Sequence, residues 1–369
     1  MKESLPKLDP ENLNVIVSHG IILRKIFKLK GLNNVDAVLA EYDTEKMNFK
    51  ILNNKPLFKS YPSYVNDEYI NYIQAGGILE RGENDYILLT PVVFGAHTKR
   101  VIYYATSKDL ENWSFQKQKI LSTEQIPFAK KEGNVFSTGN PMPLKKNRFL
   151  VLLGVEQPNG NYTCAYMIID NQLKIIQPPQ EIKIPNWYGT TQNSFPLSII
   201  KHKTTYRILL HRRAKQSLET EVYEITTKNL FKTLTSGEKI ITSRNIQNAK
   251  RDKGYLRGKA DDASYIKFNS ELYILLGSEE MSSQYVTSIN REYGLLKLEN
   301  NKWIHDNRSP LIINPINIHH KYPEYEWATD HLGGFISTIF KDNYLHLFLT
   351  FGTDNPDYLI SGIKVKVKD

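Results

Sequence analysis

Three aspartates stand where short polar stretches turn into apolar strands, and their type and spacing suit glycosidic-bond chemistry. Asp261 and Asp262 lie together in Lys259-Ala-Asp-Asp-Ala263, and Asp330 opens a similar stretch further along the chain. Cleavage of a glycosidic bond usually needs two carboxylates beside it, one protonated and one ionised. Asp261 or Asp262 would supply one and Asp330 the other. Alternation along a strand would point Asp261 and Asp262 to opposite faces. Alternatively, one caps a turn while the other pairs with Lys259 or Arg257.

His331 follows Asp330 directly and adds a group that either binds a hydroxyl or orients a carboxylate. Gly333 and Gly334 come next, and glycines let backbone pass close to a ligand. The competing interpretation is a histidine whose hydrogen bonds are satisfied inside the core. Both interpretations stay open on the sequence alone.

Amide and aromatic side chains at comparable positions extend this set. Gln74, Asn140 and Asn193 stand at the starts of apolar strands, and an amide offers both a donor and an acceptor to hydroxyl groups. Trp327 lies in a loop before such a strand, where an indole ring gives a sugar an apolar platform; core packing is the alternative. These four residues are therefore predicted to bind a ligand rich in hydroxyl groups.

The elements that would position these residues are strands. From Val35 onward, β-branched and aromatic residues alternate with polar ones, and Gly, Asn, Asp and Pro turns interrupt them. One unit recurs: a strand that opens with small or polar residues and becomes apolar, a short polar turn, and a second apolar strand. The first strands of these units begin at Tyr72, Ser137, Thr191, Gly258 and Asp330.

This repeat predicts an all-β fold: a five-bladed β-propeller over residues 35–369, preceded by a short N-terminal lead-in over residues 1–34. The first strand of each blade lines the central channel of a propeller, so the polar strand starts would share one funnel. The last repeat has three clear strands, and Val35–Tyr42 is expected to add a fourth and remove a free edge. Within the lead-in, Val15–Leu29 fits either a short helix or an irregular strand.

The segment Ile102–Trp113 shows the pattern of one blade at its third strand and outer turn. An alternating strand runs into Ser107, Lys108 and Asp109 and closes on Trp113. Asp109 is predicted to close the turn, and Trp113 to pack between blades. Neither is expected to act on a ligand.

Composition excludes several function classes. The formal net charge is +9, but lysines and arginines are spread along the chain, so no nucleic-acid partner is expected. No apolar run reaches the roughly 20 residues of a membrane span, and the first residues lack a signal-peptide core, so a cytoplasmic protein is expected. The single cysteine, Cys164, excludes an internal disulfide and a Cys-based zinc site, and His319-His320 would point apart, so no metal is expected. The oligomeric state is open.

In order along the chain, three repeats resemble glycoside hydrolase family 130, the mannoside phosphorylases and related hydrolases on five-bladed propellers. The likeness spans about residues 72–365 and is carried by YYATSKDLENW, NSFPLSIIKHKTTYRILLHRR and EYEWATDHLGGFISTIFKDNYLHLFLTFGTDNPDYLISGIKV. It implies an oligosaccharide or glycoside substrate and no organic cofactor. It also implies that one arginine of the strand end His211-Arg212-Arg213 holds inorganic phosphate as co-substrate, with His211 and Arg212 predicted to bind substrate, and that Asp354 hydrogen-bonds sugar hydroxyls. An exposed basic strand end and an Asx turn are the respective alternatives.

Two departures from that family bear on activity. The family's Asp-Pro-Arg step, which carries its catalytic acid, is Asn140-Pro141-Met142 here, and an amide is no useful general acid. The family's small, proline-rich strand here carries Asp261 and Asp262. The leading hypothesis is a carbohydrate-active propeller that cleaves a glycosidic bond, with hydrolysis favoured over phosphorolysis. The alternatives are a non-catalytic propeller that binds a glycan or a glycosylated partner, and a protein-interaction scaffold.

Overall fold

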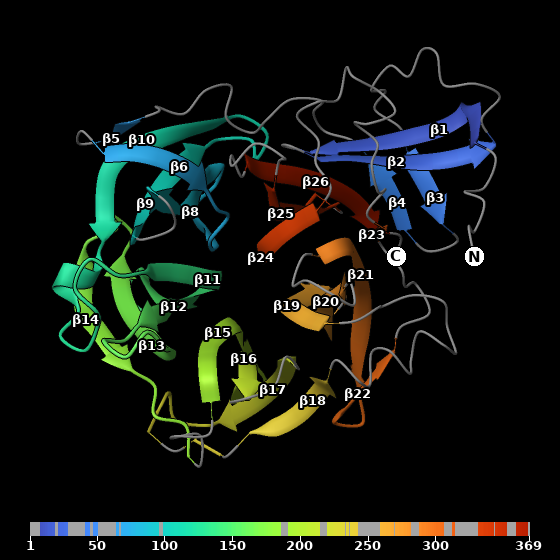
Figure 1. Cartoon of the computed structure of the whole chain (residues 1–369). Coiled ribbons are helices and arrows are strands. Elements are labelled where there is room, and N and C mark those ends of the chain that lie inside the picture. The colour runs from blue at the N-terminus through green and yellow to red at the C-terminus, as the bar shows by residue number, and fades with distance from the viewer. Residues whose placement is uncertain are drawn as a thin grey trace.

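The computed structural model is built almost entirely of β-strands, whose sheets are arranged in a ring (Figure 1). It confirms the predicted all-β propeller. In the described part of the chain, the helical element is one short 3₁₀ turn, η1 (Thr123–Gln125), and no helix is long and apolar enough to cross a membrane. The structure describes residues 8–18, 21–28, 41–44, 47–50, 64–65, 68–95, 99–185, 191–214, 220–232, 234–235, 237–242, 259–268, 270–281, 288–305, 312–313, 331–342, 344–352 and 359–367.

The first two sheets of the ring follow the chain order. The first has the order β10-β9-β8-β6-β5, with β7 beside β8; the second runs β11-β12-β13-β15-β16-β17-β18, with β14 beside β13. The strands of the first are β5 (Tyr64–Val65), β6 (Glu68–Ile73), β7 (Ile78–Gly82), β8 (Asp85–Phe94), β9 (Lys99–Ser107) and β10 (Trp113–Leu121). Those of the second are β11 (Val135–Leu144), β12 (Arg148–Glu156), β13 (Tyr162–Asp170), β14 (Ile175–Glu181), β15 (Thr191–His202), β16 (Thr205–Ala214), β17 (Thr220–Thr227) and β18 (Glu238–Thr242).

Two further sheets complete the ring, and a separate hairpin lies before them in the chain. The third sheet has the order β19-β20-β21-β22 with β23 beside β21, and the fourth has the order β24-β25-β26-β4-β3. The third contains β19 (Lys259–Phe268), β20 (Glu271–Met281), β21 (Ser288–Glu299), β22 (Lys302–His305) and β23 (Ile312–Ile313). The fourth contains β24 (His331–Lys341), β25 (Tyr344–Gly352), β26 (Leu359–Val367), β4 (Met47–Lys50) and β3 (Glu41–Thr44); the hairpin is β1 (Leu8–Ser18) and β2 (Ile21–Lys28).

The number of separate sheets corrects the five predicted blades. The second and third repeats, β11–β14 and β15–β18, are joined into one eight-stranded sheet, so four sheets make up the described part of the ring. The junction is one parallel pair between Tyr162 of β13 and Asn193 of β15. Below, the five repeats are called units one to five: β5–β10, β11–β14, β15–β18, β19–β23, and β24–β26 with β3 and β4.

A strand from early in the chain closes the ring, as predicted, but with different residues. β4 pairs with β26 along Met47–Lys50, and β3 lies outside it. The predicted Val35–Tyr42 contributes only its end to β3, and the rest of it lies outside the described residues. In the lead-in, β1 and β2 form an antiparallel hairpin, so the strand interpretation of this segment holds and the helix interpretation is wrong.

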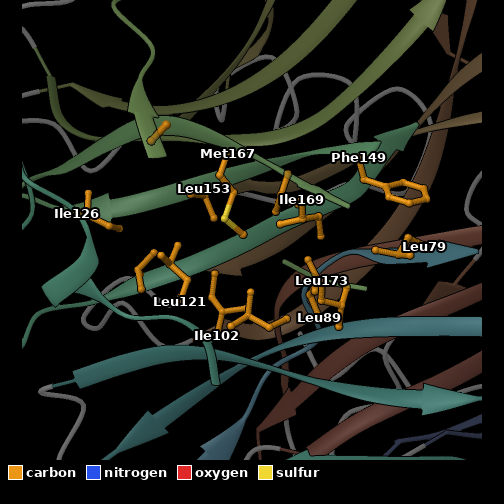
Figure 2. Packing of buried hydrophobic residues seen from close by; sticks show 14 of the residues in the cluster. Leu79, Leu89, Ile102, Leu121, Ile126, Phe149, Leu153, Met167, Ile169 and Leu173 are labelled. Carbon is orange, nitrogen blue, oxygen red and sulfur yellow. The ribbon is translucent and has the colours of Figure 1, made fainter. Parts of the chain in front are cut away.

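Apolar side chains of neighbouring units pack face to face and form the core. Leu79, Leu89 and Ile102 of unit one meet Phe149, Leu153 and Met167 of unit two in one cluster (Figure 2). Because both faces of the middle strands are covered in this way, β8 and β12 are buried along nearly their whole length. Each unit therefore needs its neighbours, which holds the strand starts in a fixed relation around the axis.

The outer turn of unit one follows its prediction closely. Oδ1 of Asp109 accepts hydrogen bonds from the backbone N–H groups of Glu111 (2.9 Å) and Asn112 (2.7 Å), which closes the turn. Trp113 then packs edge-on against Phe348 of β25, with ring centroids 5.4 Å apart. The tryptophan thus joins unit one to unit five, as expected of a residue between blades.

Candidate functional site

Four strands lie nearest the ring axis: β11, β15, β19 and β24 (Figure 1). β7 contacts both β11 and β24, and these five strands are here called the inner strands. Each departs from regular pairing near its start. In unit one, residues 74–77 separate β6 from β7. The other four have register shifts at Thr138/Met142, Pro196/Ser198, Ala260/Asp262 and Leu332/Ile336. Extra residues of this kind leave the ladder and redirect side chains, and such bulges are frequent beside active sites.

The predicted polar residues Gln74, Asn140 and Asp261 all fall within these interruptions. Asp261 is the extra residue of β19, since Ala260 faces Ser278 and Asp262 faces Gly277. The extra residue interrupts the regular alternation from which opposite orientations of Asp261 and Asp262 were predicted, so those orientations stay a prediction. Asp262 is only 3% exposed. It is a buried carboxylate directly after a bulge, which is an unusual place for a charged group unless it is paired or used.

Glycines let the inner strands approach one another at these bulges. A Cβ atom on Gly77 would collide with the carbonyl oxygen of Gly139, and one on Gly139 would collide with that of Leu197. Gly139 also has a φ of +59°, which L-residues rarely adopt. Units one to three therefore meet backbone against backbone at this level, and the residues before it on each strand surround the axis.

Hydrogen bonds from side chains to backbone tie the inner strands together at the same level. The Thr138 hydroxyl of β11 donates to the Pro196 carbonyl of β15 (2.6 Å). The Tyr265 N–H of β19 donates to the Ser198 hydroxyl of β15 (3.2 Å). These bonds cross from unit to unit and fix the relative height of the strands.

Asn140 makes two such ties at once. Its Oδ1 accepts a hydrogen bond from the backbone N–H of Ile78 in β7 (3.3 Å), and its Nδ2 donates to the carbonyl of Thr338 in β24. A carboxylate could make the first bond but not the second, so the amide is required for this arrangement. Ligand binding by Asn140 stays a prediction, and one N–H of its amide remains for it.

A chain of aromatic and cationic side chains, here called the aromatic arc, crosses units one to three: Arg100, Phe136, Tyr162, Phe195 and His211. Phe136 is central, with its ring centroid 5.5 Å from that of Tyr162, 5.6 Å from that of Phe195 and 5.1 Å from the guanidinium carbon of Arg100. Phe136 itself is buried against Gly154, whereas Tyr162 and Phe195 are half-buried. Partly exposed rings of this kind are the platforms on which sugar rings stack.

The two predicted basic residues of unit three have defined surroundings. The His211 ring is 4% exposed and lies parallel to the Phe195 ring, with centroids 4.3 Å apart. Arg212 donates to the Tyr223 hydroxyl (3.0 Å), which in turn donates to Glu221 (3.0 Å). Burial, followed by the negative charge of Glu221, raises the pKa of Tyr223. Arg212 is thus held in a fixed position and is not a freely exposed strand end.

Glu156, at the end of β12, is a buried carboxylate that sequence reasoning missed. It accepts hydrogen bonds from Lys130 (2.7 Å) and from both the backbone N–H (3.0 Å) and the side-chain amide (2.6 Å) of Asn134. Burial opposes its ionisation, but these donors outweigh burial and hold the pKa of Glu156 below its usual value. The signal was an acid that ends an otherwise apolar strand, Phe-Leu-Val-Leu-Leu-Gly-Val-Glu.

A second buried carboxylate, Glu224 of β17, joins units three and four. It accepts from Arg207 (2.6 Å), from the Tyr265 hydroxyl (2.7 Å) and from the indole N–H of Trp303 (3.3 Å). Burial, with the adjacent Glu224 charge, raises the pKa of Tyr265 well above its usual value, so the phenol stays a donor. These partners fully occupy Glu224, which marks it as a structural group.

Several buried polar atoms of the inner strands have no hydrogen-bond partner within the described part of the protein. Gln74 is 7% exposed, and its Oε1 is one of them. Buried acceptors of this kind are normally satisfied by water or by a ligand, which agrees with the predicted role of Gln74. The hydroxyl oxygens in this condition belong to Ser137, Ser194, Ser264 and Ser337.

The remaining predicted residues are placed only in part. Asn193 in β15, Asp261 in β19 and His331 in β24 are located by their backbone. Trp327, Asp330 and Asp354 lie outside the described residues. Within the described ranges, no group of histidine, cysteine, aspartate and glutamate side chains could hold a metal ion.

Sequence reasoning also missed Arg100, Tyr162 and Phe195 of the aromatic arc. Phe195 lies in the Phe-Pro strand start of the family resemblance, but the sequence alone gives no sign that its ring meets Phe136 of the preceding unit.

Comparisons with known proteins give a fold without a family. No protein-family model matches this sequence, and no curated protein matches it. Among solved structures, the chain is similar to a β-1,2-mannobiose phosphorylase from Listeria innocua, at 12% identity over 84% of this chain and 94% of that one, with a TM-score of 0.57. A thermostable family-43 glycoside hydrolase matches at 12% identity over 79% of this chain and 88% of that one (TM-score 0.54).

A sucrose-6-phosphate hydrolase from Lactobacillus gasseri is a further structural neighbour, at 12% identity over 82% of this chain with a TM-score of 0.55. The present chain spans only 62% of that protein's length. At such identities the likeness establishes the propeller fold and leaves membership of family 130 unshown.

Proposed function

We propose that this propeller binds a carbohydrate at the bulged starts of its inner strands and cleaves a glycosidic bond there. The observation that carries the proposal is Asp262, a carboxylate 3% exposed and directly after the bulge of β19. A carboxyl group beside a glycosidic bond can act on it as the acid or the base of cleavage.

The register between β15 and β19 supports a shared site for Asp262 and the aromatic arc. Tyr265 of β19 bonds to Ser198 of β15, and three residues earlier on each strand stand Asp262 and Phe195. Because each unit repeats the same meander, neighbouring inner strands run in the same sense. The bulge between Pro196 and Ser198 takes up about one residue of β15, so Phe195 and Asp262 stand within about one residue of the same height. A sugar stacked on Phe195 would then have an acid beside it.

The names of the structural neighbours favour the same chemistry. They include a mannobiose phosphorylase, a glycoside hydrolase and a sucrose-6-phosphate hydrolase, all on propeller folds similar to this one. A mannoside is therefore the first substrate to test. We assign Asp262 the role of acid or base, Asp330 or Asp261 that of its partner, and Gln74, His331 and Asp354 that of holding hydroxyl groups.

Hydrolysis is favoured over phosphorolysis. Arg212 is bound by Tyr223, and Met142 stands where the family resemblance places an anion-binding arginine. The loss of that arginine leaves fewer donors for inorganic phosphate than the family pattern would provide. Phosphate as a co-substrate is consequently the weaker form of the proposal.

The test is turnover of aryl mannosides and mannobiosides, with and without inorganic phosphate, by the wild type and by Asp262→Asn and Asp330→Asn. A lost general acid or base should lower the rate roughly 10²–10⁴-fold. Asp342→Asn, a change in an exposed turn after β24, should leave the rate unchanged. Inactivity of the wild type on a broad glycoside panel would refute the catalytic proposal.

A second function is favoured by Asn140 alone. At the position where the resemblance places a catalytic acid, this chain has an amide that ties β7 to β24. A propeller that binds a glycan or a glycosylated partner without cleaving it would be consistent with that exchange. Calorimetric binding of oligosaccharides without turnover would identify this function, and the absence of both would exclude it.

A further inference from the structure

The half-buried arginines in the described part of the chain have a partner on an adjacent strand, with one exception. Arg100, at the start of β9, has a buried Nε without a hydrogen bond, as do Arg81, Arg207 and Arg212. Arg100 differs from these three because no described side chain accepts a hydrogen bond from its terminal guanidinium nitrogens. It also has no carboxylate partner among the described residues. The matched pairs are Arg81 with Asp85 (3.0 Å), Arg207 with Glu224 (2.6 Å) and Arg212 with the hydroxyl of Tyr223 (3.0 Å).

The position of Arg100 is fixed from two sides. Its backbone N–H donates to the Gly133 carbonyl (3.3 Å), and it forms a parallel bridge with Asn134. Its guanidinium lies over the Phe136 ring, and that phenylalanine is only 3% exposed. Stacking on an aromatic face leaves the in-plane N–H fork of a guanidinium to meet a planar or tetrahedral anion.

The carboxylate next to this position is already satisfied. Glu156, which binds Asn134, accepts three hydrogen bonds from Asn134 and Lys130. Lys99, adjacent to Arg100 in the chain, is neutralised by both oxygens of Glu68 (2.8 and 2.9 Å). Lys99 and Lys130 are thus each paired with a glutamate, whereas no described carboxylate balances the charge of Arg100.

Arg100 also lies at one end of the aromatic arc. The half-buried rings of Tyr162 and Phe195 both contact Phe136, the ring that carries Arg100. A sugar stacked on either ring would direct a substituent toward the guanidinium. An anionic substituent would make the charge-assisted, bidentate pair that this arginine lacks in the protein.

We propose that Arg100 determines specificity for a carbohydrate with an anionic substituent, either the carboxylate of a uronic acid or a phosphate ester. This inference rests on the proposed function, because it needs a sugar on the aromatic arc. It adds that the sugar is negatively charged, a property that neither the fold nor the family resemblance indicates.

The test compares binding of methyl mannoside, mannuronate and mannose 6-phosphate by calorimetry. The wild type should bind at least one acidic sugar roughly 10–100-fold more tightly than the neutral one, and the two acidic sugars distinguish carboxylate from phosphate. Arg100→Gln should abolish the preference while retaining the neutral sugar. Arg100→Lys should keep part of the preference, and Arg148→Gln, at the exposed start of β12, should keep all of it.

The outcomes separate the two proposals. Equal affinity for neutral and acidic sugars, or a preference that survives in folded Arg100→Gln protein, would overturn the role of Arg100 and leave carbohydrate binding intact. If no sugar binds, the proposed function fails. Titration with inorganic phosphate then tests the anion site by itself. The NMR signal of the Arg100 Nε–H should shift if Arg100 binds the anion, and an unchanged signal would refute the site.

Discussion

Replacement of Asn140 by aspartate should destabilise the fold at neutral pH and much less in acid. In the wild type, Nδ2 of Asn140 donates to the carbonyl of Thr338, a residue only 4% exposed. Asn140→Asp turns this donor into an acceptor and sets a charged oxygen against that carbonyl. A buried group left without its partner costs about 1–3 kcal/mol, and more when a charge is involved.

The pH dependence distinguishes this mechanism from simple loss of packing. A protonated carboxyl can donate to the Thr338 carbonyl, so the new group should titrate higher in the folded state than in the unfolded one, where a value of about 3.9 applies. A folded-state pKa that is raised contributes stability below the unfolded value and loses it as the pH rises. The gap to the wild type should therefore narrow below about pH 4.

Urea denaturation of wild type, Asn140→Asp and Asn140→Ala at pH 7 and in acid measures both effects. Asn140→Ala lacks both hydrogen bonds, and its loss of stability relative to the wild type should be independent of pH. Equal destabilisation by Asn140→Asp at both pH values would refute the account of the Thr338 bond. A gain of glycoside cleavage by Asn140→Asp would show that this position reaches substrate in addition to joining the units.

Three other outcomes test the interior. Glu224→Gln leaves the buried Arg207 without a balancing charge and should lower the free energy of unfolding by about 3–5 kcal/mol, measured by denaturation. Glu68→Gln removes a more exposed ion pair and should lower it by at most about 1 kcal/mol. Gly139→Ala should lower the free energy of unfolding by more than about 2 kcal/mol or prevent folding, because φ at this position is +59° and the new Cβ would meet a carbonyl of β15. Gly82→Ala, at a position with open space around it, should unfold near the wild-type melting temperature. Burial raises the pKa of Cys164, so thiol reagents should modify it only on unfolding, and rapid labelling of native protein would contradict its placement.

The sequence predicted what is decided locally. The turn around Asp109 closes over four residues, and its carboxylate, hydroxyl and amide partners stand beside one another in the chain. Alternation likewise marked the half-buried strands, because burial there has a period of two, whereas β8 and β12 are continuous apolar runs buried on both faces. These features need no knowledge of distant residues.

Contacts between distant segments could not be predicted in the same way. The single pair of Tyr162 with Asn193, which merges two repeats into one sheet, leaves no pattern in either strand. The bulges at the strand starts could not be predicted either. An extra residue is visible in a sequence only where it interrupts an alternation of apolar and polar residues, and small or polar residues such as Gly139 and Asn140 show no such alternation. The extra residue at Asp261 interrupts the alternation on which the predicted orientations of Asp261 and Asp262 depended.

The partners of buried charged groups could not be predicted from the sequence for the same reason. Glu224 takes hydrogen bonds from residues 17, 41 and 79 positions away in the sequence. The missing partner of Arg100 is visible only in the fold, where the other half-buried arginines of the described residues bond to side chains on adjacent strands. A sequence states which charges exist, and the fold decides which of them are balanced.

The pairing of β4 with β26 has a consequence for synthesis of the protein. Lys50 meets Lys364 in this pair, so the seam joins segments separated by more than 300 residues. During translation, the early strand must wait, with its edge uncovered, until nearly all of the intervening chain has left the ribosome. Contacts of such long range slow folding and leave an open edge available to other chains. Nascent-chain aggregation is therefore expected to peak just before β26 emerges.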